Sequence, residues 1–514
     1  MKRKGSITIY FVLVMAVIVP LILAQITSAK VSAGRMQAAN SMDQALFSLF
    51  GHYYGPLAKE YGLLFLNAGG SGSGPDLEAV ITSLEDSMNY ILEPNKGFSV
   101  LTGKNLLNLK REAMALTAFT LATDAGGAPF RAQAIRCMKD TVGLEAVSLL
   151  QEELTAGKNA EETGKELLND SESVSYNDIE NMAAEAAESA SEGGGGDSGG
   201  DGGSDGGTET GVEEGSEEGG SGDTGESSVP DDFVNPLPIL EQLQSLTVLN
   251  LVVPDPSAIP SENVDKSELV SGRDLASGAG LIDIGEAGDN GDPFFKAWII
   301  THFRDFTDPS SHSAYKYQKE YLLNGKKSDR ANLNAVVTTL LLTREAVNMF
   351  CLLTDEIKSA ELSTLSLMIA TFLAIPEAEP IIKLVLAAGW AYAESLVDVR
   401  ALLEGKRVPY VKDSSSWQTD AEGLAKSGGS LDGLTEDCPW GMRYSHFLDA
   451  LLLAFGDKKL TMRCMDIVES EIRGQTGSDF RLDSCIGALT AEAEMRAERK
   501  VTFPVEMSAS YMDL

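Results

Sequence analysis

The first fifty residues carry the strongest hydrophobic pattern of the chain. Lys2, Arg3 and Lys4 precede a mainly apolar run from Ile7 to Ile26, and no further charge follows until Lys30. In a helix this run is long enough to cross a hydrocarbon core of about 30 Å. The pattern predicts a transmembrane helix, and the basic residues before it predict a cytoplasmic N-terminus with the remaining chain outside the membrane.

A removable signal peptide is the alternative interpretation, since Thr27-Ser28-Ala29 offers small residues for cleavage. The apolar region of a signal peptide usually spans only about 7 to 15 residues, which favours a retained anchor here. Pro20 lies inside the run and predicts a kink. A kinked helix suggests packing against partner helices, although single prolines are also common in membrane helices.

The helical pattern continues beyond the apolar run. Apolar residues recur at spacings of three and four at Ala39, Met42, Leu46, Leu49 and Tyr53. One long helix from about Ile7 to about Phe50 is therefore expected, which projects as a stalk and ends near Gly51. Tyr61 to Leu66 is expected to form a short buried strand.

Further helices are predicted before residue 190. Pro75 and Asp76 suit a first helical turn, and periodic apolar residues follow. The helices are expected over residues 77–91, 106–121, 132–150 and, from the alanine content, 183–190.

The stretch from Glu192 to Ser228 consists almost entirely of Gly, Ser, Thr, Asp and Glu, and Val212 is its only large apolar residue. Too little apolar surface is present to offset the entropy of ordering, so a disordered acidic linker is expected. Calcium binding by the spaced Asp197, Asp201 and Asp205 is the functional alternative, but neither the calcium-loop pattern nor the nonapeptide repeat is matched.

Most of the chain after the linker is also expected to be helical. Ser328 and Asp329 suit a cap before the first of these helices. Helices are predicted over residues 333–353, 357–375, 380–404, 447–455 and 461–472, and strands over 246–253 and 501–511. The apolar runs 362–375 and 381–393 are short for a membrane span, which favours a buried bundle over a second span.

The resulting fold class is α+β and predominantly helical. A single N-terminal transmembrane helix continues into a stalk, and an extracytoplasmic helical domain with a small β component follows, interrupted by the disordered linker. The expected boundaries are 1–30, 31–190, 191–230 and 231–514. Two arrangements remain open: residues 61–66 share one sheet with the C-terminal strand, or the regions flanking the linker are independent domains.

Composition narrows the class of function. Across 514 residues, 41 Lys and Arg stand against 76 Asp and Glu, for a formal net charge of −35, which disfavours a nucleic-acid partner. A hydrophobic content of 43% excludes global disorder, and the length predicts two to three folded units.

No catalytic, cofactor or metal motif is found. The glycine-rich residues 69–74 lack a phosphate-loop spacing, and His52, His302, His312 and His446 lack a metal-ligand spacing. The five cysteines contain no C-x-x-C pair, and Cys464 with Cys485 is a weak disulfide candidate. The protein is therefore not expected to be an enzyme.

One charged cluster stands on an otherwise apolar helix. Glu394 and Asp398 are one helical turn apart, with Arg400 and Lys383 nearby. A buried ionic network is one interpretation, and a solvated face of a bundle helix is the favoured one.

The N-terminus resembles type IV prepilins, particularly the TadE and TadG minor-pilin group. A short basic leader ends at Gly5, Ser6 follows, and a hydrophobic helix continues into a stalk. The resemblance implies possible cleavage between Gly5 and Ser6. Prepilins usually carry Glu where this chain has Tyr10, so inefficient or absent cleavage is predicted, as is a role other than major filament subunit.

Most of the chain is similar to uncharacterised anchored proteins of Gram-positive anaerobes that accompany tight-adherence pilus genes. The likeness lies in GSITIYFVLVMAVIVPLILAQITSAKVSAGRMQ, KEYGLLFLNAG, EYLLNGKKSDRANLNAVVTTLLLTREAVN and WAYAESLVDVRALLEGKRVP. It implies location and context and transfers no catalytic residue.

The leading hypothesis is a membrane-anchored extracytoplasmic structural or interaction protein, an accessory of a tight-adherence pilus. Its expected partners are the lipid bilayer and, through the N-terminal helix, pilus or pseudopilin subunits. The alternatives are an anchored extracellular hydrolase with a dispersed site and a ligand-binding ectodomain.

Overall fold

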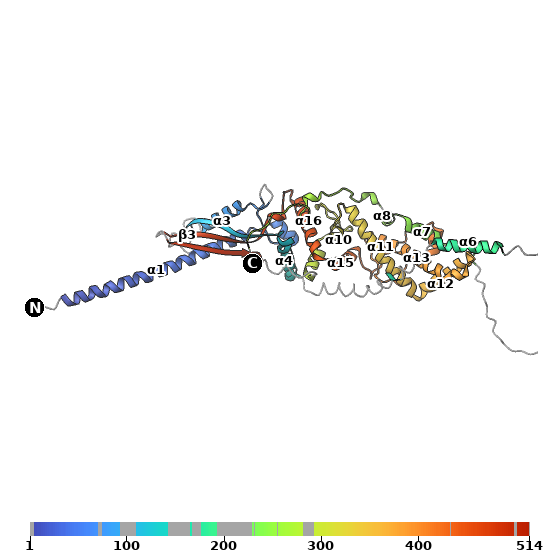
Figure 1. Cartoon of the computed structure of the whole chain (residues 1–514), viewed down its shortest axis with the longest axis horizontal. Helices are drawn as coiled ribbons and strands as arrows, with labels where there is room; N and C mark the ends of the chain where they lie inside the picture. Colours follow the sequence, from blue (N-terminus) through green and yellow to red (C-terminus); the bar gives the residue numbers. More distant parts are fainter. Residues whose placement is uncertain are drawn as a thin grey trace, which may run out of the picture. The chain divides into compact units, whose positions relative to one another are not determined.

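A computed structural model describes residues 5–69, 74–92, 109–141, 165–166, 176–192, 229–230, 232–253, 255–280, 292–431, 433–497 and 501–512. These residues form a mostly helical protein with a small antiparallel sheet (Figure 1). The predicted linker from Glu192 to Ser228, with its three spaced aspartates, lies outside the described residues except for Glu192, which ends a helix. The basic residues 2–4 and part of the glycine-rich loop also lie outside the described residues.

The N-terminal helix α1 extends over Gly5–Phe50 and continues through Pro20 without a break. Gly51 forms the turn that follows, so the long helix and its stop are as predicted. Because side chains i, i+4 and i+7 share one face of a helix, its later part can bury a continuous stripe.

The sheet is built around one long strand near the C-terminus. Its strands are β1 (Leu66–Asn67), β2 (Lys110–Leu121), β3 (Cys485–Arg496) and β4 (Thr502–Ser510). All three others pair antiparallel with β3, in registers that include Leu66↔Ile486, Lys110↔Arg496 and Ala488↔Ser510. The predicted terminal strand is thus confirmed as β4, and of the two arrangements left open the shared sheet is the one found, through the pairing of β1 with β3.

Two expectations about this region are wrong. Residues 106–121 were expected to be helical, but Lys110–Leu121 is strand β2, because the ladder with β3 satisfies its backbone and overrides the helix propensity of its alanines. Residues 61–65 are not a strand, since α2 (Gly55–Tyr61) ends at Gly62 in the left-handed conformation and only Leu66 of the predicted segment pairs.

One face of the sheet is covered by α1 and by α3 (Leu77–Leu92), the helix predicted after Pro75 (Figure 1). The core beneath them includes Met42 and Leu46 from α1, Leu84 from α3, and Leu489 and Met495 from β3, all nearly without exposure. Burial of these apolar side chains holds the later part of α1 against the sheet.

A second core in the same part of the chain gathers around Trp298. It is formed by α2, α4 (Asp124–Thr141), α9 (Pro293–His302), α10 (Gln318–Asn324) and α16 (Asp457–Thr476). The indole of Trp298 is fully buried, and its Nε1 donates to the carbonyl of Tyr61 at 2.9 Å. The predicted helix 461–472 is confirmed, and the predicted residues 142–150 lie outside the described part.

The chain divides into two compact units. The first comprises Met1–Leu150, Pro260–Leu333 and Asp449–Leu514, and the second comprises Gln151–Ile259 and Asn334–Leu448. Both units are discontinuous in sequence and follow neither of the predicted ranges 31–190 and 231–514. The reason is that β3 and β4 complete a sheet begun by N-terminal residues.

The second unit is a helical bundle. It contains α6 (Tyr176–Glu192), α7 (Leu237–Ser245), α8 (Val248–Val252), most of α11 (Asp329–Thr354), α12 (Glu356–Phe372), α13 (Glu379–Leu403), α14 (Ala421–Lys426) and the start of α15 (Tyr444–Ala454). The helices expected over 333–353, 357–375, 380–404 and 447–455 are confirmed, whereas the expected strand 246–253 is α8. Short 3₁₀ turns occupy Pro256–Ala258 and Pro376–Ala378 in this unit, and Lys266–Glu268 and Leu482–Ser484 in the first unit.

Candidate functional sites

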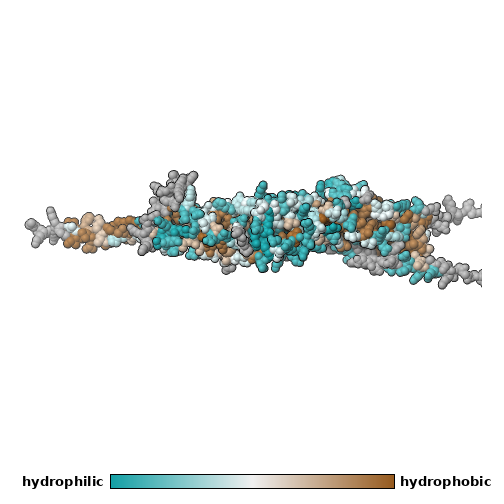
Figure 2. All heavy atoms as spheres, turned by 90° about the horizontal axis from the view of Figure 1, so that it is seen from above, coloured by the Kyte–Doolittle hydropathy of each residue, from teal (hydrophilic) through white to brown (hydrophobic). Residues whose placement is uncertain are grey.

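The first candidate site is the apolar part of α1. Ile7 is 68% exposed, Tyr10 69% and Ile26 47%, and Pro20 between them is exposed as well. These side chains form an apolar surface along the free part of the helix (Figure 2). Leaving so much contiguous apolar surface in water is unfavourable, and such surfaces mark membrane or protein contacts.

The docked part of α1 begins near Gly34. A Cβ built on Gly34 would lie 2.5 Å from Cζ of Phe503 in β4, so only glycine allows this close approach. At the other end, the hydroxyl of Tyr511 donates to the carbonyl of Phe50 at 2.9 Å. Contacts with the C-terminal strand region therefore hold both ends of the docked part, and the membrane-length part remains free.

Three helices in the described part of the chain are long and apolar enough to cross a membrane, namely α1, α11 and the segment Pro376–Leu403. The most apolar stretch of α1 is 0% buried, whereas the most apolar stretches of the other two are 61% and 67% buried. The latter two also hold the fully or nearly fully buried charges of Arg344, Glu394 and Asp398. Of the three, α1 is the helix whose apolar surface is left uncovered by the described residues.

The second candidate site is a buried charge network inside the second unit. Glu394 and Asp398 project from α13, Lys412 comes from the segment after this helix, and Arg344 comes from α11. The ammonium Nζ of Lys412 lies 2.6 Å from Asp398 Oδ1 and also contacts Glu394 Oε1. Arg344 Nη2 lies 2.9 Å from Asp398 Oδ2. All four side chains are at most 1% exposed.

Electrostatics favour the charged forms of Asp398 and Lys412. Burial by itself raises the pKa of Asp398, but the adjacent cations of Lys412 and Arg344 outweigh it and hold this pKa below its usual value. Burial lowers the pKa of Lys412, but the carboxylates of Asp398 and Glu394 outweigh it and raise this pKa. Two carboxylates thus balance two cations, which a buried cluster requires to avoid an uncompensated charge.

The favoured expectation of a solvated face for Glu394 and Asp398 is therefore wrong, and the partners expected nearby are elsewhere. Lys383 donates to Ser363 Oγ, and Arg400 pairs with Glu404. The sequence analysis did not identify Arg344 as a partner of Asp398, although the pattern of α11 indicated it. Arg344 and Asn348 occupy the helical stripe of Val337, Leu341 and Cys351, so two polar side chains stand at core positions.

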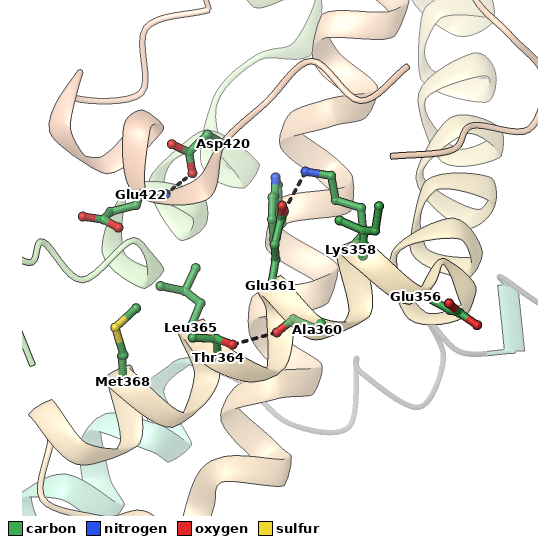
Figure 3. A pocket seen from close by; sticks show the side chains of 11 residues that line it. Glu356, Lys358, Ala360, Glu361, Thr364, Leu365, Met368, Asp420 and Glu422 are labelled. Atoms are coloured by element: carbon green, nitrogen blue, oxygen red, sulfur yellow. Dashed lines mark hydrogen bonds and ion pairs between the residues drawn. The ribbon is translucent and has the colours of Figure 1, made fainter. Parts of the chain in front are cut away.

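A third candidate is an open pocket of about 810 Å³ in the second unit, lined mainly by α12 together with Trp390, Asp420 and Glu422 (Figure 3). Lys358 Nζ lies 5.2 Å from the ring centroid of Trp390 and 2.7 Å from Glu361 Oε2. The ammonium covers the indole face, so the ring is not free to stack on a ligand. Among the described residues that line it there is no His, Cys or Ser.

The five cysteines, all within the described residues, form no disulfide bond. Cys464 and Cys485, the candidate pair, are both buried in the core around Trp298, and the predicted bond is not formed. Each thiol fills apolar space as a small hydrophobic side chain, and Cys485 Sγ donates to the carbonyl of Arg481. Burial raises the pKa of the Cys485 thiol far above its usual value, which makes it unreactive.

The remaining candidate groups are the histidines and the residues at the start of α1. His302 contacts the carbonyl of Trp298 through Nδ1 at 2.9 Å, and burial lowers its pKa. Within the described ranges, no three His, Cys, Asp or Glu side chains are grouped so as to hold a metal ion. Gly5 begins α1 and Ser6 follows within the helix.

Comparison with known proteins gives one family. A model described as "Family of unknown function (DUF5702)" matches residues 226–497. No curated protein and no solved structure matches the chain.

Proposed function

The chain belongs to the DUF5702 family of unknown function, and we propose that it is a membrane-anchored extracytoplasmic structural or interaction protein. The observation that carries the proposal is the division of α1. The apolar first part of α1 is unburied and is long enough to cross a bilayer, while its later part packs on the sheet. A helix docked in this way transmits position and force from the membrane to the folded unit.

The proposed orientation places the N-terminus in the cytoplasm. Lys2, Arg3 and Lys4 stand directly before the apolar run, and positive residues on this side of a first span are retained in the cytoplasm. The bulk of the chain then lies outside, where its net charge of −35 favours solubility.

We propose further that the anchor acts as an accessory or minor component of a tight-adherence type IV pilus. The support is the resemblance of the leader and helix to TadE and TadG proteins, together with a helix whose later half packs on an antiparallel sheet and whose first half is free. Tyr10 stands where prepilins carry Glu. A hydroxyl cannot form the ion pair a carboxylate offers to a neighbouring N-terminal amine, which argues against a repeating filament subunit.

Deletion of Met1 to Lys30 tests the anchor. The truncated protein is expected in the soluble fraction, and the full-length protein in the membrane fraction resistant to alkaline extraction. A second test keeps the full chain and replaces Leu13 and Val17, two exposed residues of the free part, by lysine. This change should weaken membrane retention without removing the segment. A truncated protein that still behaves as integral would mean that α11 or α13 inserts.

Protease treatment of intact cells, with and without detergent, tests the orientation. Degradation of the folded units in intact cells is expected.

N-terminal analysis of protein from native membranes tests processing. A mature chain that begins at Ser6 would contradict the uncleaved anchor, and one that begins at Lys30 would identify a signal peptide. Association with pilus subunits is tested by crosslinking through a photoreactive residue at Tyr10.

A further inference from the structure

The buried network of the second unit places an amine directly against a carboxyl group. Lys412 Nζ is 2.6 Å from Asp398 Oδ1, and neither side chain has any exposed surface. The indole of Trp417 lies beside the ammonium, with its centroid 5.9 Å from Nζ. An amine and a carboxyl group held together in a dry site are the two components of an amide bond.

The two oxygens of Asp398 have different surroundings. Oδ2 accepts three N–H groups, from Arg344 Nε at 3.0 Å, Arg344 Nη2 at 2.9 Å and Asn348 Nδ2 at 2.9 Å. Oδ1 faces Lys412. Three fixed donors on one oxygen would stabilise the negative charge that develops there when a nucleophile adds to the carboxyl carbon. The other oxygen is then the one that leaves.

Glu394 supplies the group that such a reaction needs to move protons. It lies one helical turn before Asp398 and contacts the same Nζ. Its oxygens accept the backbone N–H groups of Gln418 at 2.9 Å and Thr419 at 2.8 Å, which fixes its orientation. A positioned carboxylate in contact with the nucleophile satisfies the geometry of a general base.

We propose that Lys412 and Asp398 condense into an intramolecular amide bond, with Glu394 as the base and acid. Glu394 accepts a proton from the Lys412 ammonium and passes it to Oδ1 of Asp398, and the free amine then adds through Nζ to the carbon of the neutral carboxyl group. Arg344 and Asn348 hold the resulting oxyanion at Oδ2. The tetrahedral adduct loses Oδ1 as water, which takes up two protons that originate from Nζ, one of them carried by Glu394. One C–N bond forms, one C–O bond breaks, and no electrons are exchanged.

The ionised pair is the ground state, so the reaction waits for the proton transfer from Lys412. Moving this proton to Glu394 leaves the total charge of the four side chains unchanged. A neutral amine is also less costly to hold in a dry interior than an ammonium. The reaction occurs once per chain, and the product joins the segment after α13 to the helix itself.

The crosslink would give the second unit a covalent tie that its cysteines do not provide, since none of the five described cysteines forms a disulfide. The proposal rests on the buried network alone. It is independent of the anchor and of any pilus partner.

Intact mass spectrometry of the purified full-length protein tests the proposal. We expect a mass lower than that of the sequence by one water molecule, and a branched proteolytic peptide that joins Lys412 to Asp398. Mapping of both termini excludes processing as the source of the difference. A folded wild-type chain with the unmodified mass would overturn the proposal, as would a branch between Lys412 and Glu394.

Two variants test the assigned roles. E394Q keeps the shape of the side chain and removes the base, so the folded protein should retain the full sequence mass for much longer than the wild type. K412R should never lose water. The buried pair of Lys319 Nζ and Asp449 Oδ1, 2.7 Å apart in the first unit, is the internal control. Among the described residues, Lys319 forms no ion pair with a second carboxylate, so Lys319 and Asp449 should stay unlinked. A branched peptide that joins these two residues would show that the base is not required. If E394Q fails to fold, the wild-type mass still decides the proposal.

Discussion

The contact between Gly34 and Phe503 yields a prediction about the sign of a stability change. In an open helix position, Gly→Ala stabilises a protein by up to about 1 kcal/mol, because alanine loses less backbone entropy on folding. At Gly34 an added Cβ would lie 2.5, 2.9 and 3.0 Å from three ring atoms of Phe503, distances that require the ring or the helix to move. Phe503 is only 4% exposed, so the ring has little room.

Overpacking of this kind costs about 1–3 kcal/mol. With a cost near the middle of this range, Gly34→Ala is expected to destabilise the first unit by a net of about 1 kcal/mol. That loss corresponds to a fall in melting temperature of about 2–4 °C for a domain of about 150–250 residues. Gly34→Val adds two methyl groups to the same clash and should cost more.

The assay is thermal unfolding of the detergent-solubilised full-length protein by circular dichroism, combined with hydrogen exchange of peptides from the docked part of α1. Faster exchange of these peptides is expected in both variants. The control repeats Gly34→Ala in a Phe503→Leu variant. Without the phenyl ring, the substitution should leave the free energy of unfolding unchanged or increase it. An increase in melting temperature for Gly34→Ala in the wild-type background would refute the packing of α1 on β4.

Three further outcomes are expected. Tyr511→Phe removes the donor to the carbonyl of Phe50 and should cost about 1 kcal/mol in urea unfolding, whereas an unchanged midpoint would contradict this clamp. Burial by itself raises the pKa of Asp483, but hydrogen bonds and charge from Arg481 and Arg273 outweigh it and lower this pKa to about 2. Because a depressed carboxyl pKa stabilises the fold above the unfolded value of about 3.9, this stabilisation should be lost as pH falls from about 4 to about 2, and Asp483→Asn should flatten stability curves over that window. Thiol reagents should modify Cys464 and Cys485 only after denaturation, and five thiols should then react per chain without reductant; fewer than five would indicate a disulfide.

Local sequence was sufficient for the long helices and their ends. The periodic apolar positions of α1, α3, α11, α12 and α13 predicted these helices because each side chain pattern reports one buried face. Gly51 and the residues before α11 predicted where helices stop and start, since caps and stops depend on a few neighbouring residues. The membrane-length apolar run was visible for the same reason, because its length and lack of charge are properties of one segment.

Strands β2 and β3 depended on residues far apart in the chain. The alanine-rich Lys110–Leu121 has local preferences compatible with a helix, and it becomes a strand because β3, more than 350 positions later, supplies its hydrogen bonds. The division into two discontinuous units follows from the same long-range pairing. No local pattern encodes which distant segment completes a sheet.

The buried network shows the same limit for side chains. The sequence placed Glu394 and Asp398 on one helical face, which is a local property, but it did not reveal their partners Lys412 and Arg344. Whether a charged face is solvated or buried depends on what packs over it, and here the segment with Lys412 and the stripe of α11 cover it. The sequence by itself therefore determined the long N-terminal helix and the bundle helices. Only the tertiary structure decided that the charges of α13 meet inside the protein, because burial and ion pairing depend on contacts between segments that are distant in the chain.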